Sequence, residues 1–160
     1  RVPVDLKLVI DDVIKRGKQD RLLADIEVVR HFPAGSRFVE CNPVQLGQAV
    51  SNILDNAVDA MKHSDARIRR ITLRIDDPEP GEIEVSFADT GPGIEPDIAG
   101  RVFMPFVSGK PEGMGMGLMF CQSVIEAHGG RIWIASNGPT GLELRFTLPI
   151  DTARLMDAVR

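Results

Sequence analysis

Apolar residues recur at helical spacing near the N-terminus and again in the middle of the chain, so the pattern predicts two amphipathic helices. The first has an apolar face made of Leu6, Val9, Ile10, Val13 and Ile14. Gly17 follows this face, and we expect it to end the helix in a left-handed cap. The second helix is expected to start at the N-cap residue Asn42, with Pro43 in the first helical position and Gln45 placed to close a capping box. It should run to about His63.

Between and after these helices, apolar and polar residues alternate in the manner of strands. The expected strands cover residues 26–32, 37–41, 70–76, 82–88, 131–136 and 142–148. The first two are separated by a Pro33-Ala34-Gly35 turn, which predicts a hairpin. In the strand over 82–88, Ile83, Val85 and Phe87 alternate with polar residues, as in a sheet with one face on the core. A third helix is expected over 118–128.

The composition is typical of one soluble globular domain. The chain has 160 residues, 43% hydrophobic and 26% charged, and we expect one domain over residues 1–150 with a tail over 151–160. The net charge of -4 argues against binding of nucleic acid, which relies on clustered Lys and Arg. No apolar run reaches the roughly 18 residues of a membrane span, so we expect no membrane contact by this domain.

Two cysteines, Cys41 and Cys121, stand in apolar surroundings without metal-site spacing. This favours buried free thiols over a disulfide or a metal site. Free thiols are typical of a reducing compartment, so a cytoplasmic location is expected. Whether a longer parent protein is anchored in a membrane stays open.

The second predicted helix carries a polar stripe apart from its apolar face. At about 100° per residue, the stripe comprises Gln45, Gln48, Asn52, Asn56, Asp59 and His63. Asn52 and Asn56 are neighbours one turn apart. A solvent-facing stripe would account for them, but such faces usually use Lys and Glu, whereas Asn and Asp are poor helix formers. The composition therefore favours a lined pocket, in which an amide oxygen suits Mg²⁺ that also binds phosphate oxygens and water.

A second candidate site follows the strand expected over 82–88. Asp89 stands at the end of this strand, and Gly91 and Gly93 allow the backbone to turn sharply toward a ligand. A carboxylate accepts a hydrogen bond from an exocyclic amine, so Asp89 suits adenine and not guanine, which has a carbonyl at that ring position. An ordinary Asp-Gly turn is the alternative interpretation.

Residues 95–117 lose periodicity and predict a loop that is rich in glycine. Four glycines fall within nine residues: Gly109, Gly113, Gly115 and Gly117. Lys110, between them, offers a cation to phosphate. The last glycine opens the helix expected over 118–128, whose free N–H groups and dipole can meet phosphate oxygens. The spacing matches neither a P-loop nor the dinucleotide-binding glycine pattern, so those two classes are disfavoured.

Taken in order, these stretches resemble the catalytic and ATP-binding domain of bacterial sensor histidine kinases. That family is a branch of the superfamily that includes gyrase, the heat-shock chaperone ATPases and MutL. Its four boxes are matched by residues 51–57 (SNILDNA, N box), 89–93 (DTGPG, G1 box), 103–106 with Lys110 (FMPF, F box) and 113–118 (GMGMGL, G2 box). The resemblance covers roughly residues 3–149.

The resemblance implies an α/β two-layer sandwich, with a mixed, mainly antiparallel sheet of about five strands, three helices on one face, and ATP between them. It implies that Asn56 holds Mg²⁺ and that Asn52 contacts phosphate. Asp89 would bind the adenine amine and Lys110 would reach the terminal phosphates, with Thr147 a weaker candidate at the adenine end. The full set of expected nucleotide-binding residues is Asn52, Asn56, Asp59, Asp89, Gly91, Gly93, Ile94, Lys110, Gly113, Met114, Gly115, Met116, Gly117, Leu118 and Thr147.

The implied activity is transfer of the ATP γ-phosphate to a histidine on a separate dimerisation hairpin, for relay to a response regulator. We expect no phosphoacceptor in this chain, because His31, His63 and His128 all stand in positions typical of structural residues. Asn52 occupies the position at which gyrase-like relatives have a glutamate that activates water. An amide cannot serve as that general base, so slow hydrolysis is expected.

Two other functions remain open at this point. A related serine kinase that acts on anti-sigma antagonists would share the nucleotide site. That class usually lacks an upstream segment such as residues 2–6 (VPVDL), which resembles the linker after a histidine kinase hairpin. The third hypothesis is a degenerate, nucleotide-free pocket that serves as an interaction module.

Overall fold

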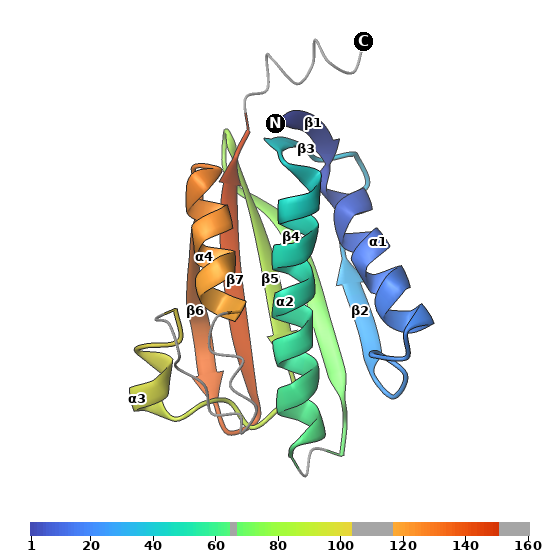
Figure 1. Cartoon of the computed structure of the whole chain (residues 1–160), viewed down its shortest axis with the longest axis vertical. Coiled ribbons are helices and arrows are strands. Elements are labelled where there is room, and N and C mark those ends of the chain that lie inside the picture. Colours follow the sequence, from blue (N-terminus) through green and yellow to red (C-terminus); the bar gives the residue numbers. More distant parts are fainter. Residues whose placement is uncertain (65–66, 104–116, 151–160) are drawn as a thin grey trace.

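The computed structural model describes residues 1–64, 67–103 and 117–150 of the chain (Figure 1). Its strands are β1 (Val2–Asp5), β2 (Glu27–His31), β3 (Phe38–Cys41), β4 (Arg70–Glu79), β5 (Glu82–Asp89), β6 (Arg131–Gly138) and β7 (Gly141–Pro149). Its helices are α1 (Leu6–Gln19), α2 (Pro43–Lys62), α3 (Pro96–Ala99) and α4 (Gly117–Ala127). No helix within these ranges has the length and apolar content to cross a bilayer.

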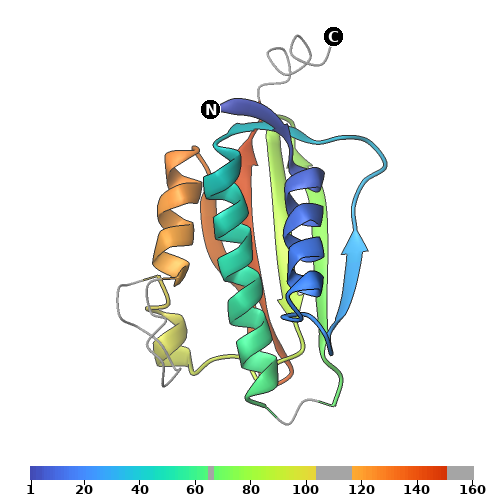
Figure 2. The ribbon, with the colours of Figure 1, turned by 45° about the vertical axis from the view of Figure 1, so that its right-hand side comes forward.

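Two layers make up the fold. The main sheet has five strands in the order β2-β4-β5-β7-β6, and all neighbours are antiparallel except the parallel pair β2 and β4. Figures 1 and 2 show α1, α2 and α4 side by side over one face of this sheet, with α2 in the middle. The sandwich that the resemblance implied is therefore confirmed, with α3 as an additional short helix.

The core lies between these two layers. Alternate residues of β5, namely Ile83, Val85 and Phe87, are at most 3% exposed, which confirms the predicted alternation. Phe87 packs on Phe146 of β7, with ring centroids 5.9 Å apart. The buried face of α2 comprises Leu46, Gly47, Ala49, Val50, Ile53, Leu54, Ala57, Val58 and Met61. Each large apolar side chain buried in this way contributes about 1.5–3 kcal/mol, so this layer contact is the main driving force of folding.

The cysteines add to the same core. Both Cys41 and Cys121 are buried and free, as predicted. The Cys121 Sγ lies 3.3 Å from the Ala49 carbonyl oxygen, at the contact between α4 and α2. Burial raises the pKa of the Cys121 thiol to about 12, so it stays protonated at neutral pH and packs as a small apolar group.

The start of α2 follows the prediction in two of its three details. Asn42 caps the helix, because its Oδ1 accepts from the N–H groups of Val44 and Gln45, each at 3.1 Å, and Pro43 follows in the first turn. The expected capping box is wrong. The Asn42 N–H that Gln45 would cover donates instead to Nε2 of His128, at 3.0 Å.

His128 therefore joins the beginning of α2 to the end of α4. Its side chain is buried, and its Nδ1 lies 2.7 Å from the Val124 carbonyl oxygen. Because Nε2 accepts from Asn42, Nδ1 is the ring nitrogen that carries the proton and donates to Val124. These two bonds fix α2 and α4 to each other at one end of the helical layer.

The hairpin predicted over residues 26–41 is wrong. Its two strands form where expected, but β2 pairs in parallel with β4, and β3 pairs antiparallel with β1 in a separate two-stranded sheet. The reason is nonlocal. Residues 2–5 form a strand that aligns Val4 with Val39, and this pairing draws β3 away from β2.

The end of α1 also differs from the prediction. The helix continues past Gly17 to Gln19, and the left-handed residue is Arg21, with φ of 61°. Gly17 is needed for a different reason, since a Cβ at this position would lie 2.9 Å from Cδ1 of Leu23. The glycine allows the chain to fold back onto the helix, where the Leu23 N–H donates to the Gly17 carbonyl at 3.2 Å.

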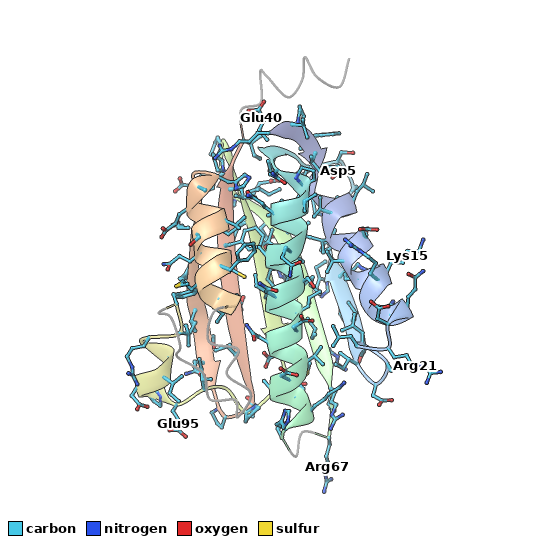
Figure 3. All side chains as sticks on the ribbon, viewed as in Figure 1. Asp5, Lys15, Arg21, Glu40, Arg67 and Glu95 are labelled. Atoms are coloured by element: carbon cyan, nitrogen blue, oxygen red, sulfur yellow. The ribbon has the colours of Figure 1, made fainter. Side chains whose placement is uncertain are left out.

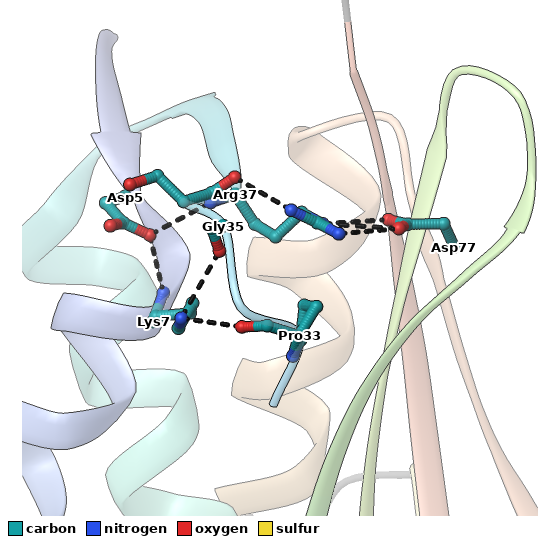
Figure 4. A network of polar contacts seen from close by, with 7 residues as sticks. Asp5, Lys7, Pro33, Gly35, Arg37 and Asp77 are labelled. Atoms are coloured by element: carbon teal, nitrogen blue, oxygen red, sulfur yellow. Dashed lines mark hydrogen bonds and ion pairs between the residues drawn. The ribbon is translucent and has the colours of Figure 1, made fainter. Parts of the chain in front are cut away.

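A polar network fastens the N-terminal strand to the rest of the domain (Figure 4). Asp5 caps α1, and its Oδ1 accepts from the N–H groups of Lys7 (3.1 Å) and Arg37 (3.2 Å). The Lys7 ammonium donates to the Pro33 carbonyl at 2.7 Å. The Arg37 guanidinium pairs with Asp77 of β4 at 3.1 Å. One carboxylate thus orders a helix start and the loop before β3 together.

We predict that Asp5→Ala lowers the free energy of unfolding by about 1–2 kcal/mol, because the cap of α1 and the Arg37 N–H lose their acceptor together. Urea unfolding followed by circular dichroism measures the loss. Asp12→Ala is the matched control, since it removes a 2.7 Å ion pair between Asp12 and Arg16 that is exposed to solvent. It should change stability by no more than about 0.5 kcal/mol. Equal losses in the two variants would contradict the structural role of Asp5.

Candidate functional site

The polar stripe of α2 faces the start of α4. The Gln48 carboxamide donates to Oδ1 of Asn52 at 2.9 Å, so the stripe is ordered by a hydrogen bond between residues four apart. Asn56, one turn further on, reaches the first residue of α4. A Cβ built on Gly117 would lie 3.7 Å from Nδ2 of Asn56. The structure therefore brings together Asn56 and the N-terminus of the helix that follows the glycine-rich stretch.

Asp89 lies beside α2, at the C-terminal end of β5. Its Oδ1 accepts from the N–H groups of Gly91 at 2.9 Å and Leu142 at 3.3 Å. Gly91 is wedged between Asp89 and α2, because its Cβ would lie 3.1 Å from Asp89 Oδ1 and 3.3 Å from Cβ of Ala60. Asp89 is thus placed next to Ala60, about one turn beyond Asn56.

Burial sets the electrostatics of Asp89. Loss of solvent raises the pKa of this carboxyl above its usual value, although the N–H groups of Gly91 and Leu142 act in the opposite direction. Both hydrogen bonds given by the described residues fall on Oδ1. Oδ2 is therefore the oxygen that can accept from a ligand amine.

The three sequence stretches line up along α2 in a fixed order. Asp89 lies beside Ala60, and the start of α4 lies beside Asn56. Asn52 is one turn closer to the N-terminus of α2. With a rise of 1.5 Å per residue, Ala60 and Asn52 are about 12 Å apart along the axis. In this order, the positive end of α4 and Asn52 are the groups suited to phosphates, and Asp89 is the group suited to an amine.

A turn at Gly93 and Ile94 follows Asp89 in the chain and is held by a residue of β6. Gly93 has φ of 72°, a conformation that favours glycine. The N–H and carbonyl of Ile94 both bond to the side chain of Asn137 in β6, at 2.9 Å and 2.8 Å. Figure 3 places Glu95, which follows this turn, at the end of the molecule opposite Asp5 and Glu40.

Not all predicted residues come together here. Lys110, Gly113, Met114, Gly115 and Met116 lie outside the described residues. Leu118 follows Gly117 in α4, and Asp59 stands in α2 beside Ala60.

Thr147 is the predicted residue that the structure places elsewhere. It is buried in β7, where it pairs with Glu84 of β5 and Arg131 of β6. Because β5 and β7 are antiparallel, Asp89 meets the opposite end of β7, at Leu142. Five residues of extended strand separate Thr147 from Leu142, which is about 17 Å. The structure therefore does not support a contact between Thr147 and the adenine end.

Asn137 and Leu142 contact the candidate site, and the sequence prediction missed both. Both belong to the hairpin of β6 and β7, more than 40 positions after the Asp-Gly motif. The turn-forming run at residues 136–141 (SNGPTG) predicts a reversal of the chain but carries no sign of its partner. No feature of the neighbouring sequence predicts the contacts with Ile94 and Asp89.

The donor set fits a magnesium ion that arrives with a nucleotide. Among the described residues there is no group of three or more His, Cys, Asp or Glu side chains that could hold a metal. Asn56 offers one neutral amide oxygen next to the helix end that would face phosphates. Mg²⁺ commonly takes one or two protein ligands and completes its shell with phosphate oxygens and water. Such an ion fits this site only together with its nucleotide.

The comparison with protein families agrees with this geometry. Residues 41–152 match the family described as “Histidine kinase-, DNA gyrase B-, and HSP90-like ATPase”. The chain belongs to this ATPase family. The matched range contains α2, Asp89 and α4, and family membership identifies ATP as the nucleotide that the domain uses.

Named relatives show which branch of this family the chain resembles. The chain is 41% identical over 117 residues to the sensor protein FixL of Bradyrhizobium diazoefficiens, an alignment that covers 72% of the chain and 22% of that protein. It is 31% identical over 152 residues to the adaptive-response sensory kinase SasA of Parasynechococcus marenigrum, covering 92% of the chain and 39% of that protein. The chain thus spans well under half the length of these relatives.

Solved structures support the same branch. The fold superimposes on the mycobacterial sensor histidine kinase MprB with a TM-score of 0.77 and 33% identity, covering 92% of this chain and 95% of that one. It superimposes on a nucleotide-free form of the catalytic domain of histidine kinase ThkA with a TM-score of 0.79 and 25% identity, covering 92% and 96%. These matches confirm the resemblance to histidine kinase ATP-binding domains, and none of them favours the serine-kinase or interaction-module alternative.

Asp89→Asn should weaken ATP binding by at least about tenfold, because an amide that keeps the bonds to Gly91 and Leu142 on its oxygen presents a donor to the adenine amine. Isothermal titration with ATP and Mg²⁺ measures the change. Thermal unfolding at neutral pH should show equal or higher stability, since the variant no longer buries a charge. Asp97→Asn, at an exposed position of α3, is the control for loss of one negative charge. ATP affinity that is unchanged by Asp89→Asn would contradict the site.

The pH dependence of the same pair of proteins tests the raised pKa of Asp89. Protonation of Asp89 is easier in the folded state, so its favourable contribution to stability is present in acid and is lost as pH rises through the folded pKa. The stability gained by Asp89→Asn should therefore be largest at neutral pH and should shrink as pH falls. The ratio of wild-type to variant ATP affinity should also fall as the pH is lowered, because protonated Asp89 no longer accepts from the amine. This fall should begin at a higher pH than the titration of an exposed aspartate would give.

Proposed function

We propose that this chain is the ATP-binding catalytic domain of a sensor histidine kinase. It transfers the γ-phosphate of ATP to a histidine on a separate helical hairpin domain, for relay to an aspartate of a response regulator. The observation that carries the proposal is the order of three contacts along α2. Asp89, the N-terminus of α4 and Asn52 follow one another over about 12 Å of the helix axis.

In the proposed complex, Oδ2 of Asp89 accepts from the adenine amine. The amide oxygen of Asn56 binds Mg²⁺, and Asn52 contacts phosphate oxygens. Mg²⁺, when bound, neutralises negative charge on the phosphates that would otherwise repel a nucleophile. The free N–H groups at Gly117 and Leu118 receive phosphate oxygens at the positive end of α4.

We assign the remaining phosphate contacts to Lys110 and to residues 113–116 (GMGM). A lysine ammonium and backbone N–H groups suit phosphate oxygens by chemistry. Positioning and charge neutralisation account for most of the catalysis of phosphoryl transfer, so a domain can promote the reaction without its own covalent chemistry.

The side chain at position 52 separates transfer from hydrolysis. Asn52 is an amide, and its oxygen already accepts from Gln48 at 2.9 Å. It cannot remove a proton from water, so ATP is retained in the site until a better nucleophile arrives. A histidine supplied by another domain fills that role.

The histidines of this chain are poorly suited to be the acceptor. Both ring nitrogens of His128 are used in buried hydrogen bonds. Nδ1 of His63 lies 2.9 Å from the Asp59 carbonyl at the end of α2, and His31 ends β2, the edge strand of the main sheet opposite β6. The acceptor therefore belongs to another domain, in line with relatives that are much longer than this chain.

The proposal predicts phosphotransfer in trans. This domain, mixed with histidine-bearing hairpin domains of sensor kinases and γ-labelled ATP with Mg²⁺, should place acid-labile label on a hairpin. Asn56→Ala should reduce the rate by at least about 100-fold, because the domain loses the side chain that would hold Mg²⁺. Gln45→Ala, an exposed change on the same helix, should leave the rate within about twofold.

Each other outcome points to a different function. Label that is stable to acid and located on serine would support the serine-kinase class. ATP binding that fails to saturate, with or without Mg²⁺, would support an interaction module. Either result would overturn the histidine kinase proposal.

A further inference from the structure

Asn137 makes a reciprocal pair of hydrogen bonds with the backbone of Ile94. Its Oδ1 accepts from the Ile94 N–H at 2.9 Å, and its Nδ2 donates to the Ile94 carbonyl at 2.8 Å. The two residues are 43 positions apart in the chain. A side-chain carboxamide thus takes the place of a neighbouring strand and satisfies both backbone groups of one residue in the turn.

The pair forms because two turns pack directly against each other. Gly93, with φ of 72°, lies against the end of β6, where a Cβ would come within 2.4 Å of the Gly138 carbonyl oxygen and 2.6 Å of Asn137 Oδ1. The register of β6 against β7 shifts between Ile134 and Ser136, shortly before Asn137. Any side chain at position 93 would separate the two turns.

The same hairpin also holds the other end of this segment. The Leu142 N–H donates to Oδ1 of Asp89 at 3.3 Å, and a Cβ on Gly141 would come within 2.3 Å of the Asp89 carbonyl oxygen. Residues 89–94 are therefore held at both ends by one hairpin. Its first strand fixes Ile94, and its second strand orients the carboxylate of Asp89.

Asn137 can be changed without loss of the fold. Its side chain is exposed, it lies at the end of an edge strand, and it belongs to no buried cluster. Hydrogen bonds between exposed groups contribute little to net stability, because water replaces them when they are lost. Two well-formed bonds at such a site do more for the position of a loop than for the stability of the domain.

We infer that Asn137 is a positioning residue for recognition of the adenine base. The inference rests on the nucleotide site proposed above and names a residue that acts through Ile94 and the turn beside Asp89. With Asn137 in place, the turn is held at the distance from Ala60 at which Asp89 can receive the amine. Without it, the turn is free to move and the carboxylate loses its alignment with the base, while the phosphate contacts at α4 are unaffected.

The test separates the base from the phosphates. Asn137→Ala should weaken ATP binding about tenfold, and should leave binding of inorganic tripolyphosphate with Mg²⁺ within about twofold. Its melting temperature should stay close to that of the wild type. Thr140→Ala, an exposed change in the turn of the same hairpin, is the control and should bind ATP like the wild type. Asn137→Asp keeps an acceptor for the Ile94 N–H but loses the donor, so its affinity for ATP should be intermediate.

A double variant tests the route of the effect. If Asn137 acts by aligning Asp89, Asn137→Ala should weaken ATP binding by less than about twofold in the Asp89→Asn background. Unchanged ATP affinity in Asn137→Ala, or equal losses for ATP and tripolyphosphate, would overturn the inference while the nucleotide site stands. Absence of ATP binding by the wild type would instead overturn the proposed function.

Discussion

The packing of α2 on the sheet determines the geometry of everything else in this domain. The helix buries one face, from Leu46 to Met61, against β5 and its neighbours. That burial fixes the rotation of the helix about its axis, so the stripe that carries Asn52 and Asn56 has only one direction to face. The contacts of Asn42 with His128 then fix the position of α2 relative to α4. Apolar packing thereby determines the direction in which the side chains of Asn52 and Asn56 point.

Asp89 shows the cost of placing a carboxylate at the edge of such a core. The carboxylate sits at the end of a strand whose preceding residues are buried, and desolvation raises its pKa. Two backbone N–H groups offset part of this penalty on Oδ1. In the proposed complex the remaining oxygen accepts from a ligand amine, which would favour adenine over a base with a carbonyl at that position. Removal of the Asp89 charge is therefore expected to raise the stability of the nucleotide-free domain and to weaken its binding of ATP.

Features encoded by neighbouring residues were predictable from the sequence. The cap at Asn42, the extent of α2 and the alternation of Ile83, Val85 and Phe87 follow from local spacing, and the structure confirms them. The order of the Asp-Gly motif and the glycine-rich stretch also led to the ATPase family, which the family match confirms. Local patterns report helix period, strand period and caps, because these depend on residues that are close in the chain.

Features that depend on distant partners were not predictable. The hairpin expected over 26–41 failed because an unforeseen strand at the N-terminus pairs with β3. The predicted end of α1 at Gly17 was wrong because that glycine makes room for Leu23. Thr147 was expected near Asp89, but the antiparallel register places Leu142 there. Asn137 was missed for the same reason, since its partner lies 43 residues away. Pairing and register are properties of the whole fold.

The central claim is that ATP binds along α2, with its base at Asp89 and its phosphates at the start of α4. Backbone N–H resonances of the domain, recorded during a titration with ATP and Mg²⁺, test this claim most directly. We expect the signals of Gly91, Leu142 and Gly117 to shift together and to saturate with one dissociation constant. Stationary signals at these three residues, with shifts confined to Gly130 and Thr147 at the other end of β7, would contradict it.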